Sequence, residues 1–430
     1  MSTAMNTELT VAAWPGMTPR LLRSEPGTES AAQYRDAGGY LPLADVDALH
    51  DAIAHAGVLG RGGAAFPVAV KLSTVRQAAQ RGADTVLVAN GEEGEPASVK
   101  DRWLLRHRPH LVLDGLRLAA RIVGARHAHV YISDERAAAA VRTALDELTA
   151  DALDGVTVSM LRVDPAYVAG EETAAVRAIN GGPAKPTDKP PRPYEEGVGG
   201  LPTVVSNVET LANLPYVHRR GAPAYRELGT DRSPGTFLAT LTGGGRAPGL
   251  YEVPFGVSVA ELVALHGVDA GRVRGALMGG YFAGLLDRRV LDGALDHDSL
   301  RSAGSGLGCG AVSLITDECP VAVGASVLAY YDHENAGQCG SCFNGTAAMA
   351  AAATALRDGI AGADDLARLQ RWSVVLRGRG ACATLDAACN IAASLLAMFP
   401  DDVARHLNAE CAQCSAGAFT ATRPFEVESS

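Results

Sequence analysis

The sequence lacks the features of a membrane, secreted or nucleic-acid-binding protein. No stretch reaches about 18 consecutive apolar residues, so we expect no transmembrane helix and no direct membrane insertion. The N-terminal region has no basic cluster followed by an apolar core, so we expect no signal peptide and a cytoplasmic location. The formal net charge is −10, which argues against nucleic acid or an anionic membrane as the main partner.

What is present describes a folded protein of several domains. The chain has 430 residues, of which 47% are hydrophobic and 20% charged. That length is too great for one ordinary core, and two to four domains are expected. Eight cysteines without an export signal indicate reduced thiols, so paired cysteines are interpreted as metal ligands before disulfides.

The order of residue patterns divides the chain into segments. Strand-like and helix-like stretches alternate from residue 46 onward, with buried strands expected at 85–89, 127–133 and 156–163, which favours an α/β architecture with a largely parallel sheet. A smaller α+β module and then a long helical stretch follow. The expected segments are an arm or partly ordered tail at 1–40, an α/β domain at 41–230, an α+β domain at 235–315, a helical bundle at 320–408 and a polar tail at 409–430.

A glycine-rich loop is the strongest phosphate-type signal. Glycines allow backbone N–H groups to approach a phosphate or a flat ring, and a helix N-terminus and a lysine follow. A helix rather than a strand precedes the loop, so the match to a dinucleotide fingerprint is weak, and a simple helix-linking loop remains an alternative. The candidate residues are Gly60, Arg61, Gly62, Gly63, Ala64, Phe66 and Lys71.

Polar residues follow expected strands at three further places. Ligands of α/β sheets bind beyond the carboxyl ends of strands, where carboxylates can accept hydrogen bonds from a ribityl or ribose chain. The alternatives are a solvated acidic turn for the first group and helix-terminal residues for the other two. The three groups are Asn90, Glu92, Glu93 and Glu95; Tyr167, Gly170, Glu171 and Glu172; and Asn207 and Thr210.

Three cysteines are arranged as ligands of a metal or an iron–sulfur cluster. Cys339 and Cys342 form a C-x-x-C pair, and Cys382 follows about forty residues later. Tetrahedral or cubane centres need four ligands, and only three fall in this arrangement. A zinc site on the same three residues is a weaker alternative.

The other cysteines are less informative. Cys309, Cys319 and Cys389 are interpreted as lone, small buried hydrophobes. Cys411 and Cys414 form a second C-x-x-C pair in the tail, for which metal binding, partner contact and no role all remain open.

Taken together and in order, these motifs resemble one family over about residues 49–407. It is the NADH-oxidising flavoprotein subunit of respiratory complex I, shared with NAD-linked hydrogenases and formate dehydrogenases. The resemblance implies an FMN-binding α/β domain, a ubiquitin-like β-grasp (soluble-ligand-binding) domain and a helical bundle with a [4Fe–4S] cluster. It also implies NADH as electron donor and a small ferredoxin-type or [2Fe–2S] protein as partner.

The resemblance also implies roles for the candidate residues. The glycine loop and Lys71 would serve FMN and NADH, and Glu172 would face the nicotinamide as one catalytic carboxylate. Glu95, the second expected catalytic residue, and Lys189 match positions that touch NADH. The FMN set would be Asn90, Glu92, Glu93, Tyr167, Gly170, Glu171, Asn207 and Thr210, with Glu92 standing where the family usually has Asp.

Three departures from the family pattern bear on function. Thr74 and Arg192 stand where the family commonly has Phe near the adenine edge, which should weaken NADH binding or change the donor, unless Arg192 stacks on adenine instead. Ala336 stands where the family has the first cluster cysteine.

Several interpretations of the incomplete cluster therefore stay open. The site could hold a [4Fe–4S] cluster with another fourth ligand, a [3Fe–4S] cluster, or nothing, as in a flavin-only dehydrogenase. A non-catalytic scaffold or ligand-binding protein is a further alternative. The candidates for a fourth ligand are His333, Glu334, Cys389, Cys411, Cys414 and water.

Overall fold

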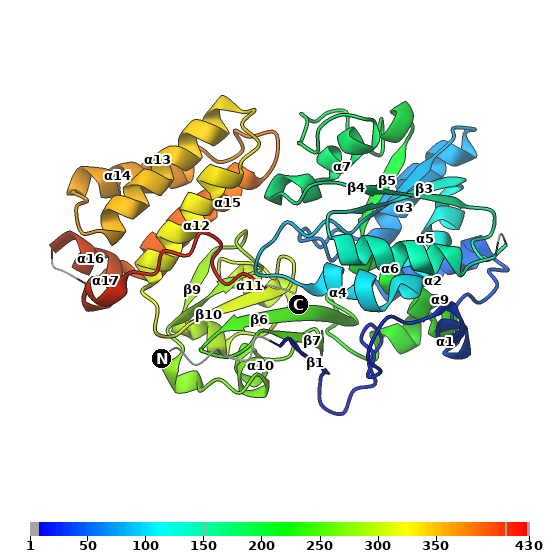
Figure 1. The fold of residues 1–430 in the computed structure, drawn as a ribbon, viewed down its shortest axis with the longest axis horizontal. Coiled ribbons are helices and arrows are strands. Elements are labelled where there is room, and N and C mark those ends of the chain that lie inside the picture. Colours follow the sequence, from blue (N-terminus) through cyan, green and yellow to red (C-terminus); the bar gives the residue numbers. More distant parts are fainter. Residues whose placement is uncertain (1–7, 150, 409–410, 428–430) are drawn as a thin grey trace.

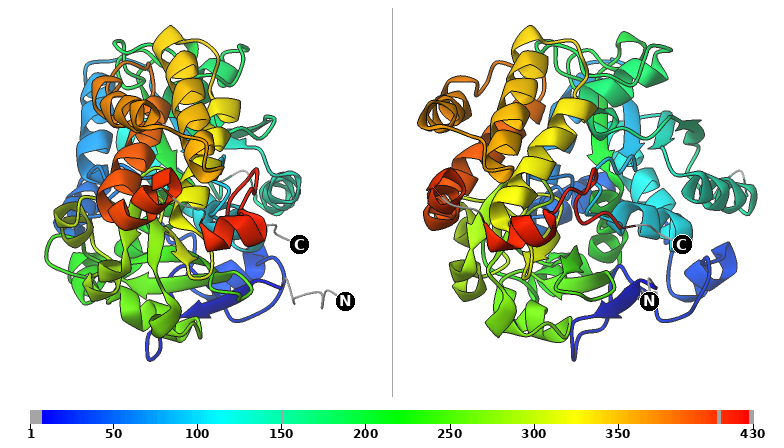
Figure 2. Two further views of the ribbon diagram at one scale, coloured as in Figure 1. Left: turned by 90° about the vertical axis from the view of Figure 1, so that its left-hand side faces the viewer. Right: turned by 60° about the vertical axis from the view of Figure 1, so that its left-hand side comes forward.

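Two sheets and a helical bundle surround a common centre in the computed structural model, which describes residues 8–149, 151–408 and 411–427 (Figure 1). The α/β part lies beside the second sheet, and the bundle stands above that sheet (Figure 2). The expected positions 1–7 of the arm and 409–410 and 428–430 of the tail lie outside the described residues.

The first sheet is parallel and has the strand order β4-β3-β2-β5. Its central strand β2 is apolar and almost wholly buried, as expected for a parallel strand covered on both faces. The expected strands at 85–89, 127–133 and 156–163 are confirmed as β2, β3 and β4, whereas β5, which follows the Pro- and Gly-rich loop, was not predicted. The strands are β2 (Val86–Asn90), β3 (His127–Ile132), β4 (Thr157–Arg162) and β5 (Thr203–Asn207).

Helices pack around this sheet and form its core. The second helix begins at the N-cap Asp45 and ends at Gly57, whose left-handed backbone favours glycine. Gly115 lets α5 approach α8, since a Cβ there would lie 2.0 Å from the carbonyl oxygen of Leu211. The helices are α1 (Ala31–Asp36), α2 (Val46–Ala56), α3 (Val68–Gln80), α4 (Lys100–His107), α5 (Pro109–Val123), α6 (Glu135–Asp146), α7 (Glu172–Ile179), α8 (Val208–Ala212) and α9 (Leu214–Arg226), with short 3-10 turns η1 (Tyr167–Gly170) and η2 (Val198–Gly200).

The second sheet is mixed, with the order β1-β7-β6-β10-β8-β9. Its two central strands, β6 and β10, run parallel, and antiparallel neighbours flank them. Sequence patterns predicted β6, β7, α10 and β8 but missed β9 and β10. The elements are β6 (Thr236–Gly243), β7 (Gly249–Pro254), α10 (Val259–Leu265), η3 (Ala270–Arg272), β8 (Gly275–Met278), β9 (Leu285–Asp287), η4 (Arg288–Asp292), α11 (His297–Ser302) and β10 (Ala311–Ile315).

From residue 8, the N-terminal arm is packed against both sheets rather than partly ordered. Strand β1 (Thr10–Ala13) pairs with the edge of β7. The backbone N–H groups of Arg20, Leu21 and Leu22 donate to the buried carboxylate of Glu252. Buried backbone donors need such partners, so these bonds hold the arm in place.

The bundle consists of helices from Pro320 onward, as the sequence predicted. Helix α12 begins directly after β10, so the bundle and the second sheet share a junction at residues 316–319. The Ala-rich run at 346–356 lies within α13. The helices are α12 (Pro320–Glu334), α13 (Gly340–Arg357), α14 (Ala363–Val375), α15 (Thr384–Met398) and α16 (Pro400–Asn408), followed by α17 (Ala412–Gly417).

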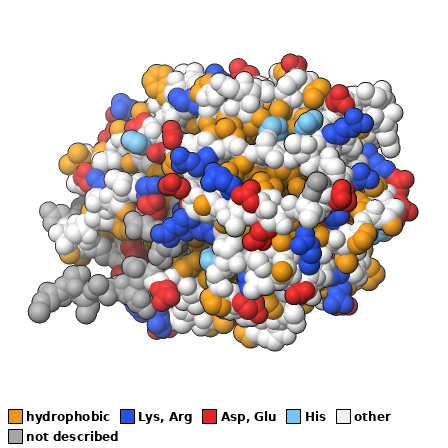
Figure 3. All heavy atoms as spheres, turned by 45° about the vertical axis from the view of Figure 1, so that its right-hand side comes forward, with side chains coloured by type: hydrophobic (Ala, Val, Ile, Leu, Met, Phe, Trp, Pro, Cys, Tyr) orange, Lys and Arg blue, Asp and Glu red, His pale blue; other side chains and the backbone are white. Residues whose placement is uncertain are grey.

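No helix in the described ranges has both the length and the apolar character that a membrane crossing needs. On the face in Figure 3, Lys and Arg side chains are interspersed with Asp and Glu side chains. No patch of a single sign dominates that face.

Candidate functional site

One cavity of about 650 Å³ collects the candidate residues from every part of the sequence. It lies where the carboxyl ends of β2 and β5 face the second sheet and the bundle. All the cofactor-binding candidates named from the sequence line it: Gly60, Arg61, Gly62, Gly63, Ala64, Phe66, Lys71, Asn90, Glu92, Glu93, Glu95, Tyr167, Gly170, Glu171, Glu172, Lys189, Asn207 and Thr210.

The glycine loop forms one wall of this cavity. A bond from the N–H of Gly60 to the carbonyl of Phe66, 2.9 Å, closes the loop on itself. A Cβ on Gly62 would lie 3.3 Å from the Cβ of Asn207, so glycine keeps the loop close to β5. Arg61 contributes only its backbone side of the loop, because its guanidinium donates into the core to Tyr225 Oη and the carbonyl of Thr236.

Two carboxyl groups beyond β2 are buried and favour their protonated form. Glu92 is 5% exposed and neither carboxylate oxygen has a hydrogen bond of ordinary geometry. Burial raises the pKa of Glu92 to about 8, and backbone N–H groups offset this only in part. Burial likewise raises the pKa of Glu95 to about 8, although the N–H of Tyr281 donates to it at 2.9 Å.

Three candidates act as helix caps as well as lining the cavity. Glu171 is the N-cap of α7 and accepts from the N–H of Thr173 at 2.8 Å. Asn207 is the N-cap of α8, and Glu93 accepts from the N–H of Arg102 in the first turn of α4 at 3.0 Å. The helix-terminal interpretation of Glu171 and Asn207 is therefore confirmed, and their side chains also face the cavity.

Glu172 lies among three cationic side chains at the cavity wall. Its carboxylate is 3.6 Å from Lys71 Nζ, 3.7 Å from Lys189 Nζ and 4.0 Å from Arg192. Lys189 also pairs with Glu171 at 2.5 Å. These cations are only partly buried and face a cavity, so they are available to an anionic ligand.

Sequence reasoning missed a buried ion cluster in the wall of the cavity. Lys100 is 1% exposed, and its Nζ lies 2.7 Å from Asp101 and 3.0 Å from Glu209. Burial acts to lower the pKa of Lys100, but the Asp101 and Glu209 carboxylates outweigh it and hold that pKa above its usual range. Asn207 Nδ2 donates to Asp101 at 2.7 Å. The available signal was the charged pair Lys100-Asp101, which opens a helix just after the acidic turn.

The bundle reaches the cavity through aromatic side chains. Tyr167 Oη is 3.1 Å from Tyr331 Oη, and the Tyr167 ring packs edge-on against Tyr330 and Tyr331. Tyr330 donates to the carbonyl of Gly94 at 3.3 Å. The second sheet adds Phe282, Cys309 and the glycines around them, which sequence reasoning also missed.

Cys339, Cys342 and Cys382 converge on a small second pocket, as their spacing predicted. Cys339 precedes α13, Cys342 lies in its first turn, and Cys382 lies before α15. Burial, and then the neighbouring thiols of Cys382 and Cys339, raise the pKa of Cys342 to about 12. Cys382 also lines the large cavity, so the two pockets share a wall.

The small pocket offers no fourth side-chain ligand among the described residues that line it. Ala336 occupies its wall with a methyl group, and the Gln338 side chain is engaged by Arg177 and the carbonyl of Pro186. His333 and Glu334 do not line it and pair with each other at 3.1 Å. Cys389 is buried outside it and lies near the carbonyl of Trp372.

The remaining cysteines correct two expectations. Cys411 and Cys414 do not join the three-thiol pocket. They lie with Cys319 and His406, within 4.8 Å of one another. Cys319 is therefore not a lone buried hydrophobe. Sequence spacing could not reveal this, because 87 residues separate Cys319 from His406 along the chain.

The residues present fit FMN and a nucleotide in the large cavity. The space, the unpartnered Glu92 carboxylate, the close-lying glycine backbone and the cations around Glu172 match the hydroxyl chain, flat ring and phosphates of those groups. The small pocket fits a cluster held by three thiolates rather than four.

Comparison with known proteins agrees with this division. Residues 53–216 match the Nuo51 FMN-binding domain, and residues 322–406 match the iron–sulfur binding region of NADH-ubiquinone oxidoreductase-F. The second NADH-quinone oxidoreductase F protein of Rhizobium meliloti (strain 1021) is 34% identical over 412 residues, which cover 90% of this chain and 97% of that protein. The chain belongs to the NADH-quinone oxidoreductase F family.

Other members and structures of this family extend the likeness. The mitochondrial NADH dehydrogenase [ubiquinone] flavoprotein 1 of Dictyostelium discoideum is 35% identical over 349 residues, 77% of this chain and 73% of that protein. The crystal structure of NAD+-reducing [NiFe]-hydrogenase in the H2-reduced state superposes with a TM-score of 0.77 and 32% identity, covering 85% of this chain. The chain spans 63% of the length of that hydrogenase chain.

The family departures are both placed at the cavities. Thr74 and Arg192 line the large cavity, and Tyr194 and Phe66 add exposed aromatic rings there. Ala336 lines the three-thiol pocket.

Proposed function

We propose that this protein oxidises NADH with FMN in the large cavity and delivers the electrons to an iron–sulfur centre held by Cys339, Cys342 and Cys382. A small [2Fe–2S] or ferredoxin-type protein is the proposed acceptor. The observation that carries the proposal is the position of Cys382, which lines both the large cavity and the three-thiol pocket. A thiolate in the shared wall gives a short route between the two groups.

FMN supplies the conversion between a two-electron hydride and single electrons. The glycine loop, Asn90, Asn207 and Thr210 are the proposed residues that hold it. Asn90 Nδ2 already donates to the carbonyl of Gly170 at 2.8 Å, which ties the end of β2 to the turn before α7. The N–H of Arg61 donates to Thr210 Oγ1 at 2.8 Å and fixes the loop against α8.

The charges around Glu172 support a nucleotide as the second ligand. Lys71, Lys189 and Arg192 surround this carboxylate, and phosphate oxygens would offer them stronger bidentate or charge-assisted partners. Glu172 is then free to orient the nicotinamide ring. Tyr194 and Arg192, both at the cavity, are the proposed adenine contacts in place of the aromatic residues that Thr74 and Arg192 replace.

The buried Glu95 carboxyl is proposed to position the same substrate. It is held at 2.9 Å by the N–H of Tyr281, in a turn where a Cβ on Gly280 would lie 2.5 Å from the Glu95 carboxylate. The raised pKa of Glu95 keeps this group a hydrogen-bond donor near neutral pH.

We further infer that the second domain is a β-grasp module. Its support is the parallel pairing of β6 with β10 in the centre of the sheet, with β7 and β8 antiparallel on either side and α10 between them in sequence. The proposed acceptor meets the protein on the bundle side, where Phe343, next to Cys342, is 47% exposed. Exposed aromatic residues are common anchors at protein interfaces.

The test compares two acceptors in Cys382→Ala protein purified without oxygen. Ferricyanide, which can accept electrons from the flavin directly, should still be reduced by NADH, whereas a [2Fe–2S] ferredoxin should not. Cys389→Ala, a buried cysteine that lines neither pocket, is the matched control and should reduce both. Unchanged ferredoxin reduction by Cys382→Ala would exclude the cluster route, and absence of flavin together with absence of dye reduction in the unmodified protein would exclude the dehydrogenase itself.

A further inference from the structure

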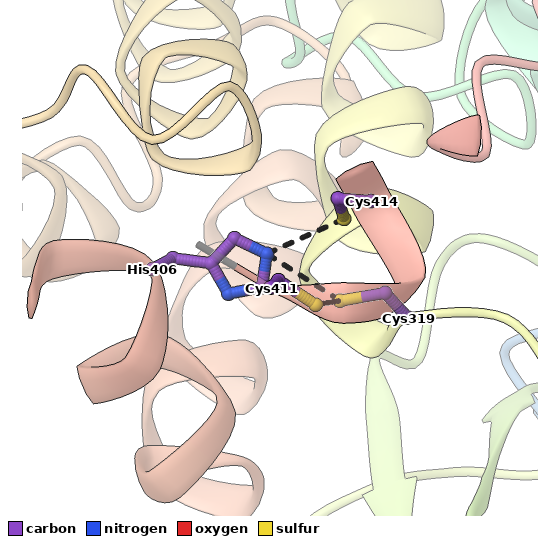
Figure 4. Close-up of side chains that lie close together, drawn as sticks. All are labelled: Cys319, His406, Cys411 and Cys414. Carbon is purple, nitrogen blue, oxygen red and sulfur yellow. Dashed lines mark hydrogen bonds between the residues drawn. The ribbon is translucent and has the colours of Figure 1, made fainter. Parts of the chain in front are cut away.

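Four potential metal ligands meet at the start of the bundle, away from the three-thiol pocket (Figure 4). Cys319 lies between β10 and α12, His406 on α16, and Cys411 and Cys414 at α17. The Cys319 Sγ is 3.9 Å from Cys411 Sγ and 3.6 Å from His406 Nε2, which is 3.4 Å from Cys414 Sγ. Residues distant in sequence thus aim their donor atoms at one point.

These separations match those around one tetrahedral ion. Zn–S bonds of about 2.3 Å and Zn–N bonds of about 2.0 Å place two sulfurs about 3.8 Å apart and a sulfur and a nitrogen about 3.5 Å apart. A disulfide would require its sulfurs at about 2.05 Å, and all of these cysteines are free thiols. An iron–sulfur cubane binds each thiolate to a different iron, so it spreads its ligands more widely than this group does.

The histidine is already oriented as a metal ligand. His406 Nδ1 lies 2.7 Å from the backbone carbonyl of Asp402. A carbonyl only accepts, so Nδ1 carries the proton and the lone pair of Nε2 points to the sulfurs. This outer hydrogen bond is the usual support of a zinc-bound histidine.

Positive charge surrounds the group. Cys319 is the N-cap of α12, where the helix dipole favours a thiolate. Arg274 pairs with Asp402 at 2.8 Å and donates to Gln413 at 2.8 Å and to the carbonyl of Glu318 at 3.2 Å. One guanidinium therefore connects the three chain segments that carry the ligands and offsets the negative charge of three thiolates.

We propose that Cys319, His406, Cys411 and Cys414 bind one Zn²⁺ in a closed structural site. Zn²⁺ replaces the three thiol protons and no redox change occurs. Three cysteines and one histidine complete the tetrahedron and leave no position for substrate, which is typical of a structural zinc site.

The site fastens the C-terminal tail across the molecule. Helix α17 has six residues and no buried residue within it, so core packing does not hold it. Beyond it, the carbonyl of Phe419 accepts from Ser326 at 3.2 Å, and the carbonyl of Pro424 accepts from Tyr281. The tail then passes the bundle toward α4 (Figure 1), where the N–H of Val427 donates to the carbonyl of Pro96 at 3.0 Å.

This path gives the metal a structural consequence at the large cavity. Tyr281 donates its backbone N–H to Glu95, and Pro96 follows Glu95 in the chain. The tail therefore covers the join between the α/β domain, the second sheet and the bundle, and the zinc site is its anchor. Loss of the metal should release residues 411–427 without removing the cluster thiols.

The test measures zinc and iron in the intact protein and in paired variants. Unmodified protein should contain one zinc per chain. Cys414→Ser should lose zinc and keep iron, whereas Cys339→Ser should lose iron and keep zinc. His406→Cys, which preserves four ligands, should retain zinc where His406→Ala does not, and this pair controls for variants that fail to fold.

Hydrogen exchange supplies a second readout. The amide of Val427 should exchange at least about tenfold faster in Cys414→Ser than in unmodified protein, since its bond to Pro96 depends on the anchored tail. Absence of zinc from the unmodified protein, iron bound in its place, a Cys319–Cys411 disulfide in non-reducing mass spectrometry, or zinc retained by Cys414→Ser would each overturn the proposal.

Discussion

The buried carboxyl of Glu92 should make the stability of the cofactor-free protein fall as the pH rises. Burial raises the pKa of Glu92 from 4.5 to about 8, so between these values the folded protein holds a proton that the unfolded chain has lost. The sign is therefore destabilising with increasing pH. At 1.36 kcal/mol per pH unit, Glu92 lowers the free energy of unfolding by about 2.7 kcal/mol between pH 6 and pH 9.

The assay compares melting temperatures of the α/β domain in unmodified and Glu92→Gln protein without FMN. For a domain of this size, 1 kcal/mol shifts the melting temperature by about 2–4 °C, so the fall from pH 6 to pH 9 should be about 5–10 °C smaller in the variant. Glu135→Gln, an exposed glutamate at the start of α6 in the same domain, is the matched control and should behave as the unmodified protein does.

Added FMN should reduce the difference between unmodified protein and Glu92→Gln, because its ribityl hydroxyls supply donors to the unpartnered carboxylate oxygens. The same fall in melting temperature in Glu92→Gln and unmodified protein would refute the argument that Glu92 is buried without a compensating partner.

Three further changes test other parts of the account. Lys189→Ala removes a cation beside Glu172 and should raise KM for NADH about tenfold in steady-state kinetics with no loss of bound FMN; a lower FMN content at normal KM would contradict the assignment. Ala336→Cys places a fourth thiol at the small pocket and should raise iron and sulfide toward a complete [4Fe–4S] cluster; unchanged iron would show that the pocket is not limited by this ligand. Gly115→Ala puts a methyl group against the carbonyl of Leu211 and should destabilise the α/β domain by about 3 kcal/mol in thermal unfolding, and an unchanged melting temperature would contradict the close helix approach.

Local patterns predicted the elements whose signal lies in a short window. The apolar run of β2 and the capped, periodic helix α2 were both predicted close to their observed bounds. Strands β5 and β10 were missed because each is five residues long, and each becomes a strand by pairing with a partner far away in sequence. Their identity depends on tertiary pairing rather than on local propensity.

The site shows the same division. Motif spacing gathered residues that do line one cavity, because each motif follows a strand or opens a helix at the same edge of the sheet. The Lys100 cluster escaped notice because a buried lysine is recognisable only from the carboxylates that fold around it. The grouping of Cys319 with His406 escaped notice because it depends on how the bundle returns to β10.

The most direct test of the central claim is an anaerobic titration of the purified holoprotein with NADH, followed by optical absorbance and EPR on the same sample. The account predicts bound FMN whose absorbance bleaches on NADH addition, together with a reduced iron–sulfur signal that Cys382→Ala lacks. A protein that binds no flavin, or whose flavin does not respond to NADH, would contradict it.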